Sequence, residues 1–214
     1  ARAGGIVEVG FVPGVAGANA VAVSPDGAHV YASAPNVSVL AVFTRDASTG
    51  LLTRVQTVNG VLGAQGVAGV KSIAISPDGK HLYLTTRLPV GQNNQGVSVF
   101  ARDPGTGFVT FVEMQRQGIN GVTGVDDPTC AVVSADGLNV YVRSRYSLAS
   151  FARNATTGAL TFMGADSADD FLGSGGDRSV AITPDGTQVY MVGKPSTVVA
   201  YDRDPGTGAL TYRL

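Results

Sequence analysis

A short segment that predicts two strands and a tight turn occurs four times in this chain, about 50 residues apart. In the second copy, the apolar run Ile73-Ala74-Ile75 predicts a strand covered on both faces. The following Ser76-Pro77-Asp78-Gly79 has the residue types of a type I turn, and we expect Gly79 and its counterpart Gly137 to take a positive φ. A second β-rich run begins at His81. The other turns are Ser24-Pro25-Asp26-Gly27, Ser134-Ala135-Asp136-Gly137 and Thr183-Pro184-Asp185-Gly186.

Each copy continues with a second motif, which in the second copy is Phe100-Ala101-Arg102-Asp103 followed by Thr106-Gly107. Asp or Asn can cap such a turn, and Gly supplies its left-handed corner. Each copy therefore predicts four antiparallel strands, a unit that must stack on its neighbours and is typical of a β-propeller blade. A β-solenoid or a Greek-key sandwich is the weaker alternative, since neither requires this period. The blades are expected at about 18–57, 70–115, 128–163 and 177–214.

The composition agrees with an all-β chain of short strands and turns. Gly accounts for 29 of 214 residues, and charged residues make up 14%, against about 25% in an average soluble domain. The net charge of −1 provides no field that would favour nucleic acid or an anionic membrane. No apolar run reaches the roughly 18 residues of a membrane span, and the single Cys excludes an internal disulfide.

The succession of Ser76–Tyr83, Val97–Asp103 and Thr106-Gly107 resembles the repeat of bacterial YVTN or lactonase-like β-propellers of the 6-phosphogluconolactonase type. The resemblance extends over nearly the whole chain and implies a propeller fold, whereas the absence of Trp excludes tryptophan–aspartate repeats. We expect a periplasmic or secreted location. Lactonases of this kind are thought to use His, Glu and Arg at the channel mouth. Here Lys71 and Arg178 occupy the corresponding inner-strand slot, but no His or Glu does.

The segment Gly5–Val12 resembles the fourth strand of a blade whose first three strands are not visible in the sequence. A ring cut open between blades exposes two apolar faces, which exceed what a monomer usually tolerates. We therefore expect the chain to be part of a larger ring, completed by further chain or by a second copy as a homo-oligomer. The start at Ala1 rather than Met also suggests that a segment upstream was removed. The alternative is a tight four-bladed monomer.

The loops on one face of the expected propeller repeat closely, while those on the other face differ between copies. Because binding sites are usually built on variable loops over a rigid scaffold, the variable face is the predicted site for a small molecule or a protein partner. The candidate ligand-binding residues there open the inner strands or lie in the adjoining loops. They are Asn19, Lys71, Thr129 and Arg178 at the inner strands, and Arg87, Arg145, Lys194 and Asp177 in the loops.

Other chemically active residue types fall in structural positions of the repeat. His29 and His81 share a slot with Asn139 and Gln188, so we interpret them as polar strand residues, and the turn aspartates as structural. Cys130 occupies a small-residue slot on an inner strand. No catalytic residue, metal or cofactor is predicted. Other carboxylates include Glu8 and Glu113 on outer strands and the irregular set Asp166, Asp169, Asp170 and Asp177, which lacks the alternation of a calcium loop.

These observations favour a non-enzymatic binding or scaffold module over an enzyme. The alternative is the sugar-lactone hydrolase that the family resemblance suggests. Lysine and arginine on the variable face are balanced by aspartate, which argues against a nucleic-acid surface.

Overall fold

Four antiparallel sheets of four strands make up the part of the chain that the computed structural model describes, residues 15–60, 66–87, 95–167, 179–192 and 197–213. Strand order within each sheet follows the chain, as in propeller blades, so the predicted all-β propeller fold is confirmed. The expected outer strand at 5–12 lies outside the described residues. The first two sheets are β1 (Ala20–Val23), β2 (His29–Ala34), β3 (Val39–Arg45), β4 (Leu52–Asn59), and β5 (Val70–Ile75), β6 (His81–Thr86), β7 (Gly96–Arg102), β8 (Val109–Arg116). The last two are β9 (Cys130–Val133), β10 (Asn139–Arg143), β11 (Leu148–Arg153), β12 (Leu160–Asp166), and β13 (Val180–Ile182), β14 (Gln188–Val192), β15 (Val198–Arg203), β16 (Leu210–Arg213).

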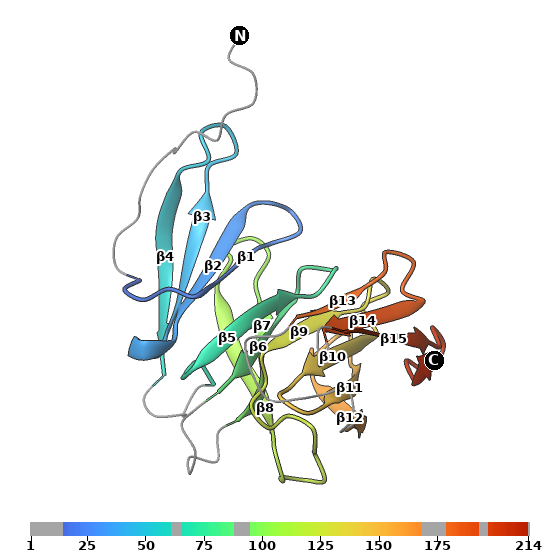
Figure 1. Cartoon of the computed structure of the whole chain (residues 1–214). Helices are drawn as coiled ribbons and strands as arrows, with labels where there is room; N and C mark the ends of the chain where they lie inside the picture. Colours follow the sequence, from blue (N-terminus) through green and yellow to red (C-terminus); the bar gives the residue numbers. More distant parts are fainter. Residues whose placement is uncertain (1–14, 61–65, 88–94, 168–178, 193–196, 214) are drawn as a thin grey trace.

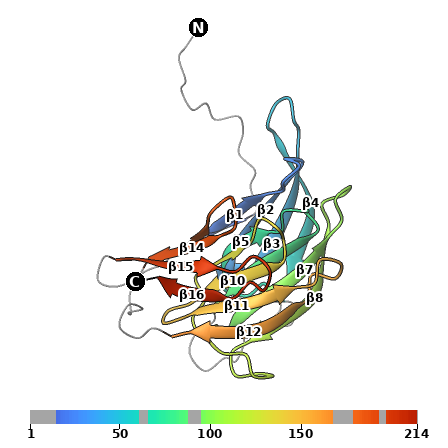
Figure 2. The same cartoon turned by 90° about the vertical axis from the view of Figure 1, so that its right-hand side faces the viewer.

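The sheets follow one another in chain order (Figure 1 and Figure 2). The first strands β1, β5, β9 and β13 pack against one another at the inner side, while β4, β8, β12 and β16 form the outer edges. Because consecutive strands are antiparallel, each sheet has two hairpins at one end and one hairpin plus the connection to the next sheet at the other. We call the end with the repeated Pro-Asp-Gly and Thr-Gly turns the turn face, and the opposite end the loop face.

The core lies between sheets and follows the two-residue period of a strand. On β6, Leu82 and Leu84 pack in a cluster with residues of the first sheet, whereas Tyr83 points the other way into a cluster with the third. Every residue of β6 is buried. Both faces of the run Ile73-Ala74-Ile75 are covered as expected, since Ile73 and Ile75 pack on the cluster with the first sheet and Ala74 on the cluster with the third, but the run is only half-buried. The reason is that β5 is the innermost strand of its sheet and has a paired neighbour, β6, on one side only.

Side chains of the Ser-Pro-Asp-Gly turn close it by hydrogen bonds within the turn. Ser76 Oγ donates to Asp78 Oδ1 at 2.5 Å, and the backbone N–H of His81 donates to Ser76 Oγ at 3.0 Å. Gly79 has φ 67° and Gly137 has φ 71°, so the predicted positive φ is confirmed at both positions. The turn is therefore a local structure that its own residues specify.

Buried arginines of the second repeated motif, which stand two residues after a Phe or, for Arg203, a Tyr, hold neighbouring sheets together at the turn face. Arg153 of the third sheet donates from Nε to the hydroxyl of Tyr83 and from Nη2 to the carboxylate of Asp78, both at 2.8 Å and both on the second sheet. Its Nη1 donates to the carbonyl of Gly137 in its own sheet, also at 2.8 Å. We call each such set a joint. The first joint is Arg102 with Tyr31 and Asp26, the second is Arg153 with Tyr83 and Asp78, and the third is Arg203 with Tyr141 and Asp136.

The joints explain why the turn aspartates recur in the sequence, as the structural interpretation predicted. Burial of the Asp78 carboxyl opposes its ionisation. Hydrogen bonds from Ser76 and Arg153 outweigh this effect and lower the pKa of Asp78 to about 2. The same environment buries the Tyr83 hydroxyl and raises its pKa to about 12. At neutral pH each joint therefore pairs a charged carboxylate with a guanidinium across two sheets. The repeated residues of the turn face thus have a structural role.

Candidate functional site

Three of the four candidate inner-strand residues, Asn19, Lys71 and Thr129, lie at the loop-face ends of their strands, but Asn19 is already engaged there. Its Nδ2 donates to the carbonyl of Val70 at 3.0 Å, and its Oδ1 accepts from Ser33 Oγ at 3.1 Å. Asn19 therefore ties the first sheet to the second. Thr129 is half-buried, and its backbone N–H donates to the carbonyl of Arg143 at 2.8 Å. These hydrogen bonds hold the inner strands in place, so Asn19 and Thr129 have a structural role at the loop face.

Lys71 is the inner-strand candidate with a distinct backbone setting. The register between β5 and β6 shifts between Val70 and Ser72, so Lys71 occupies a bulge at the start of its strand. A bulge changes the direction in which a side chain points, and such irregularities are common beside functional sites. Lys71 is half-buried. The candidates Arg178, Asp177 and Lys194 lie outside the described residues.

The structure brings two loop candidates, Arg87 and Arg145, to the connection between the second and third sheets. Arg87 forms an ion pair with Asp127, whose side chain is 15% exposed. The backbone N–H of Arg145 meets the carbonyl of Asp126 at 3.4 Å, and its guanidinium carbon lies 5.1 Å from the ring centroid of Tyr146. Arg87 is thus paired with the carboxylate of Asp127, and the backbone of Arg145 contacts that of the adjacent Asp126.

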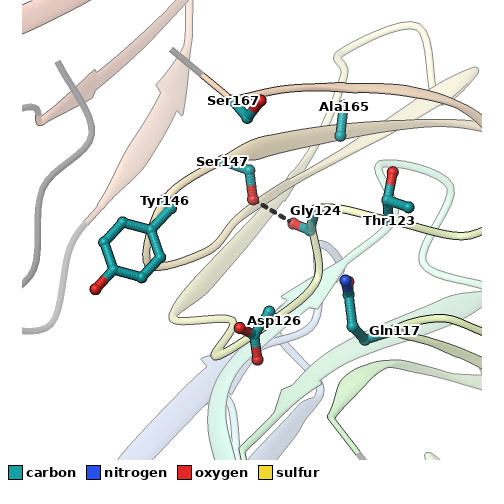
Figure 3. Close-up of a pocket in the computed structure, with 8 residues that line it drawn as sticks. All are labelled: Gln117, Thr123, Gly124, Asp126, Tyr146, Ser147, Ala165 and Ser167. Carbon is teal, nitrogen blue, oxygen red and sulfur yellow. Dashed lines mark hydrogen bonds between the residues drawn. The ribbon is translucent and has the colours of Figure 1, made fainter. Parts of the chain in front are cut away.

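A cavity of about 200 Å³ lies on the loop face beside this cluster (Figure 3). One side comes from the connection between sheets two and three, and the other from the β10–β11 hairpin and the end of β12. The Oγ of Ser147 donates to the carbonyl of Gly124 at 2.9 Å and joins the two sides. The residues that line the cavity, mostly polar, are Gln117, Thr123, Gly124, Asp126, Tyr146, Ser147, Ala165 and Ser167.

Gly124 is needed for this wall because of both its conformation and its position. Its φ is 73°, and a Cβ there would lie 2.4 Å from the Cβ of Ala165, closer than carbon atoms approach. The amide of Gln117 holds the same loop, since its Oε1 accepts from the backbone N–H of Val125 at 3.0 Å. The cavity is therefore held in shape by the loop that lines it.

The lining can form hydrogen bonds from several directions and carries one carboxylate. Ser, Thr and Tyr hydroxyls and the Gln117 amide can donate or accept, while the exposed carboxylate of Asp126 can accept a hydrogen bond or a proton. This set suits a small ligand with several hydroxyl groups. The volume is below the range of about 300–1,000 Å³ typical of drug-sized pockets, which favours a ligand about the size of a monosaccharide.

The cavity lies on the face where the sequence predicts a site, but its lining includes none of the predicted ligand-binding residues. Asp126 is one of the aspartates that balance the lysines and arginines of the variable face in the sequence, and the repeated motifs do not distinguish it, Tyr146 or Ser147 as site residues. The signal was present in the third copy, where the loop Ser144-Arg145-Tyr146-Ser147 differs from the loops of the other copies. The contacts of this loop with Asp126 and Gly124 arise only in the folded chain, so the spacing of these residues in the sequence does not predict them.

The remaining chemically active residues lie elsewhere. His29 and His81 are buried at the turn face, and Glu113 on β8 accepts from the backbone N–H of Leu160 at 2.8 Å. Asp166 accepts from the hydroxyl of Tyr201 at 2.7 Å, while the other three aspartates of the calcium hypothesis lie outside the described residues. Within the described ranges, no three His, Cys, Asp or Glu side chains gather as a metal site would require. No helix there has the length and apolar character to cross a bilayer.

Solved structures with the same fold include enzymes of sugar-lactone metabolism. A protein of Bacteroides uniformis assigned as a 6-phosphogluconolactonase superposes with a TM-score of 0.72 at 23% identity, covering 91% of this chain and 53% of that one. The periplasmic gluconolactonase of Pseudomonas aeruginosa gives a TM-score of 0.52 at 20% identity, covering 91% and 69%. At these identities the likeness shows the fold alone.

Sequence comparison also finds a curated relative. A probable 6-phosphogluconolactonase of Arthroderma benhamiae is 39% identical over 93 residues, which is 41% of this chain and 21% of the relative. The chain thus spans about a fifth of that protein and about half of the Bacteroides protein. These findings contradict the preference for a non-enzymatic binding or scaffold module, because these relatives are assigned as lactonases. That preference relied on the lack of His and Glu in the inner-strand slot, which is too narrow a criterion, because the loops of the same face also carry polar and charged side chains.

The match to a family model is the most extensive sequence evidence. The model described as lactonase, 7-bladed β-propeller covers residues 8–123, more than half of the chain. It includes the first two sheets and the loop that forms one side of the cavity up to Thr123. The sequence resemblance is thereby confirmed, and the chain belongs to the lactonase family of seven-bladed β-propellers.

Proposed function

We propose that this protein hydrolyses a sugar lactone bound in the loop-face cavity. The observation that carries the proposal is the cavity itself, a space of about 200 Å³ with a carboxylate and several hydroxyl and amide groups, in a chain of the lactonase family. A lactone of a six-carbon sugar acid has a comparable size and presents a hydroxyl on most ring carbons. The names of the relatives support 6-phosphogluconolactone and unphosphorylated gluconolactone as the substrates to test first.

Lactone hydrolysis needs a base for the attacking water and positive charge near the carbonyl oxygen. The water adds to the ester carbon as the base takes a proton from it, and the base returns that proton to the ring oxygen as the ring C–O bond breaks. The resulting sugar acid ionises at neutral pH and releases one proton. Asp126 is the carboxylate of the cavity and takes the role of general base. Arg145 follows as the nearby cation, because its backbone is held against Asp126 and its guanidinium lies over Tyr146. A guanidinium there stabilises the oxyanion that forms during attack.

Arg87 has a different role from Asp126 and Arg145, because it is paired with Asp127. Arg87 and Asp127 neutralise one another, and the Asp127 side chain is largely buried. The backbone N–H of Asp127 also donates to Gln95 Oε1 at 2.7 Å. This pair therefore anchors the connection that carries Asp126, while Asp126 and Tyr146 remain exposed at the cavity.

The location and assembly of the enzyme are further parts of the proposal. A periplasmic or secreted location is consistent with the periplasmic gluconolactonase that shares this fold. A small-molecule substrate with no nucleic-acid partner agrees with the net charge of −1. Further blades, from additional chain or from a second copy, would complete the ring around the site.

The test is proton release on addition of 6-phosphogluconolactone or gluconolactone, followed in a pH-stat with the purified protein. Asp126→Asn should reduce kcat by about 100-fold or more, since general bases contribute that much, and Arg145→Leu should reduce kcat/KM. Asp202→Asn is the matched control, because Asp202 is an exposed aspartate of the fourth sheet, away from the cavity. Hydrolysis no faster than the spontaneous reaction, or full activity in both cavity variants, would refute the proposal.

A further inference from the structure

The two histidines of this chain occupy equivalent positions in two of the three joints. His29 lies in the first joint beside Arg102, and His81 lies in the second beside Arg153. The third joint has Asn139 in the same place, where Arg203 Nη2 donates to Asn139 Oδ1 at 2.6 Å. The same architectural contact is therefore built twice with a titratable acceptor and once with an acceptor that does not titrate.

The geometry fixes the protonation state that each histidine joint requires. His81 Nδ1 lies 2.7 Å from Arg153 Nη2, and His29 Nδ1 lies 2.8 Å from Arg102 Nη2. A guanidinium nitrogen can only donate, so Nδ1 must accept, and the imidazole must be neutral with its proton on Nε2. Both rings are 3% exposed. A proton added to Nδ1 would place two donors and two positive charges face to face inside the joint.

The ring of His81 has little room to turn away from the arginine. It packs on the Thr-Gly turn of the third sheet, where a Cβ on Gly158 would lie 2.2 Å from His81 Cδ2. The ring of His29 packs on Gly107 of the second sheet in the same way, at 2.1 Å. Relief of the charge conflict therefore requires the sheets to separate at the turn face.

The charged groups around the two histidines differ in one informative respect. His81 faces Arg153, Asp78 and Lys80, with the neutral hydroxyl of Tyr83 on the same guanidinium. His29 faces Arg102 and Asp26 with Tyr31, and also the carboxylate of Asp103. In the Thr-Gly turn opposite His81, the position of Asp103 is taken by Asn154. The first joint thus has one extra negative charge that favours an imidazolium, and the second has an extra positive charge, Lys80, that disfavours it.

We propose that the joint between the second and third sheets is an acid-sensitive contact that opens when His81 is protonated, while the third joint, with Asn139, is not. Burial and then the charge of Arg153 lower the pKa of His81 from its usual value of 6.5, and burial and Arg102 lower that of His29. A depressed pKa means that the folded state favours neutral histidine. The contribution to stability is therefore present above pH 6.5 and is lost as the pH falls toward the folded pKa.

The acid-sensitive joint and the loop-face cavity connect the same two sheets at opposite ends. One side of the cavity is the connection from β8 to β9, and the other belongs to the third sheet. Acid therefore acts on the contact between the sheets that carry the cavity. This inference stands on the joint geometry and does not depend on the substrate proposed above.

An NMR titration of the imidazole resonances tests the proposal directly, because the chain has two histidines and the variants His29→Asn and His81→Asn assign them. We expect both to titrate below 6.5, with His81 at a lower pH than His29. Asn154→Asp should raise the pKa of His81, since Asp at the equivalent positions 46, 103 and 204 caps the same turn. Asp103→Asn is the reciprocal variant and should lower the pKa of His29. A wild-type His81 that titrates at or above His29, or no shift in Asn154→Asp, would overturn the proposal.

Thermal unfolding gives an independent readout. Between pH 7.5 and pH 5 the wild-type Tm should fall further than that of His81→Asn, which places in the second joint the acceptor already present in the third. Identical pH dependence of the two proteins would show that the joint does not sense acid.

Discussion

Single residues decide whether the turn face can form, and the turn glycines are the clearest case. Gly79 has φ 67°, in a region that side chains rarely adopt. A Cβ there would also lie 3.1 Å from Nη1 of Arg102, which donates to the carbonyl of Gly79 at 2.8 Å. The glycine therefore serves two purposes, a turn conformation and space for the arginine of the joint.

Gly79→Val should destabilise the protein by about 1 kcal/mol or more, because a β-branched residue is strained at positive φ. Urea unfolding of the purified protein measures the effect. Gly105→Ser is the control, since Gly105 has no positive φ and Ser48 occupies the equivalent position of the first copy. If the valine variant were as stable as wild type, the glycine would not be required for this turn.

Strands and turns become a larger structure through the joints, which connect elements of different sheets. The side chain of Arg153 is 1% exposed, while its partner Asp78 is 33% exposed, so the pair is buried on one side only. The equivalent residue of the first sheet, Arg45, is exposed and donates to the carbonyl of Gly27 at 3.3 Å. The chain thus contains the same arginine in a joined and in an unjoined setting.

Arg153→Met should lower the free energy of unfolding by about 2 kcal/mol or more, because it leaves the Tyr83 hydroxyl and the Asp78 carboxylate without their partner. Arg45→Met should change it by less than about 0.5 kcal/mol, as expected for an exposed side chain. Chemical denaturation of both variants under the same conditions makes the comparison. Equal losses in the two variants would mean that the joints contribute nothing particular to stability.

At the level of the whole molecule, the two end sheets carry complementary halves of a joint. The first sheet has the exposed Arg45, and the fourth has Asp185 and Tyr190 in the positions that accept an arginine in the other sheets. The hydroxyl of Tyr190 donates to Gln188 Oε1 of its own sheet at 2.7 Å. Val21 and Val198 are 68% and 73% exposed on these sheets. Charge and apolar surface both support association of the end sheets with further blades.

In a solution of the 214-residue chain alone, only a second copy can supply the further blades. We therefore predict reversible self-association, measured by analytical ultracentrifugation at micromolar concentration. Arg45→Glu and Asp185→Arg should each weaken it, and the two changes combined in one chain should restore it, because the charges are then exchanged. A species of 21.8 kDa at every concentration would contradict the prediction.

Sequence reasoning succeeded where a structure depends on neighbouring residues. Gly79 and the turn aspartates follow from turn chemistry, and the four-strand period follows from their spacing. It failed where packing decides the outcome. Ile73 and Ile75 pack on the cluster with the first sheet, yet the unpaired edge of the innermost strand leaves them half-buried, which the sequence pattern does not indicate. The position of Asp126 opposite Ser147 depends on how the second sheet connects to the third, which strand patterns do not encode.

The joints also determine when each sheet can be covered by the next one during synthesis on the ribosome. Arg102 and Tyr31 are 71 residues apart in the chain, and Arg153 and Tyr83 are 70 apart. At about 5–20 residues per second, each tyrosine and its aspartate emerge from the ribosome several seconds before their arginine. During that interval the face of the newest sheet has no cover, so every sheet is briefly the one most exposed to aggregation or to a chaperone. Among the described sheets, the first would therefore be covered before the second, and the second before the third.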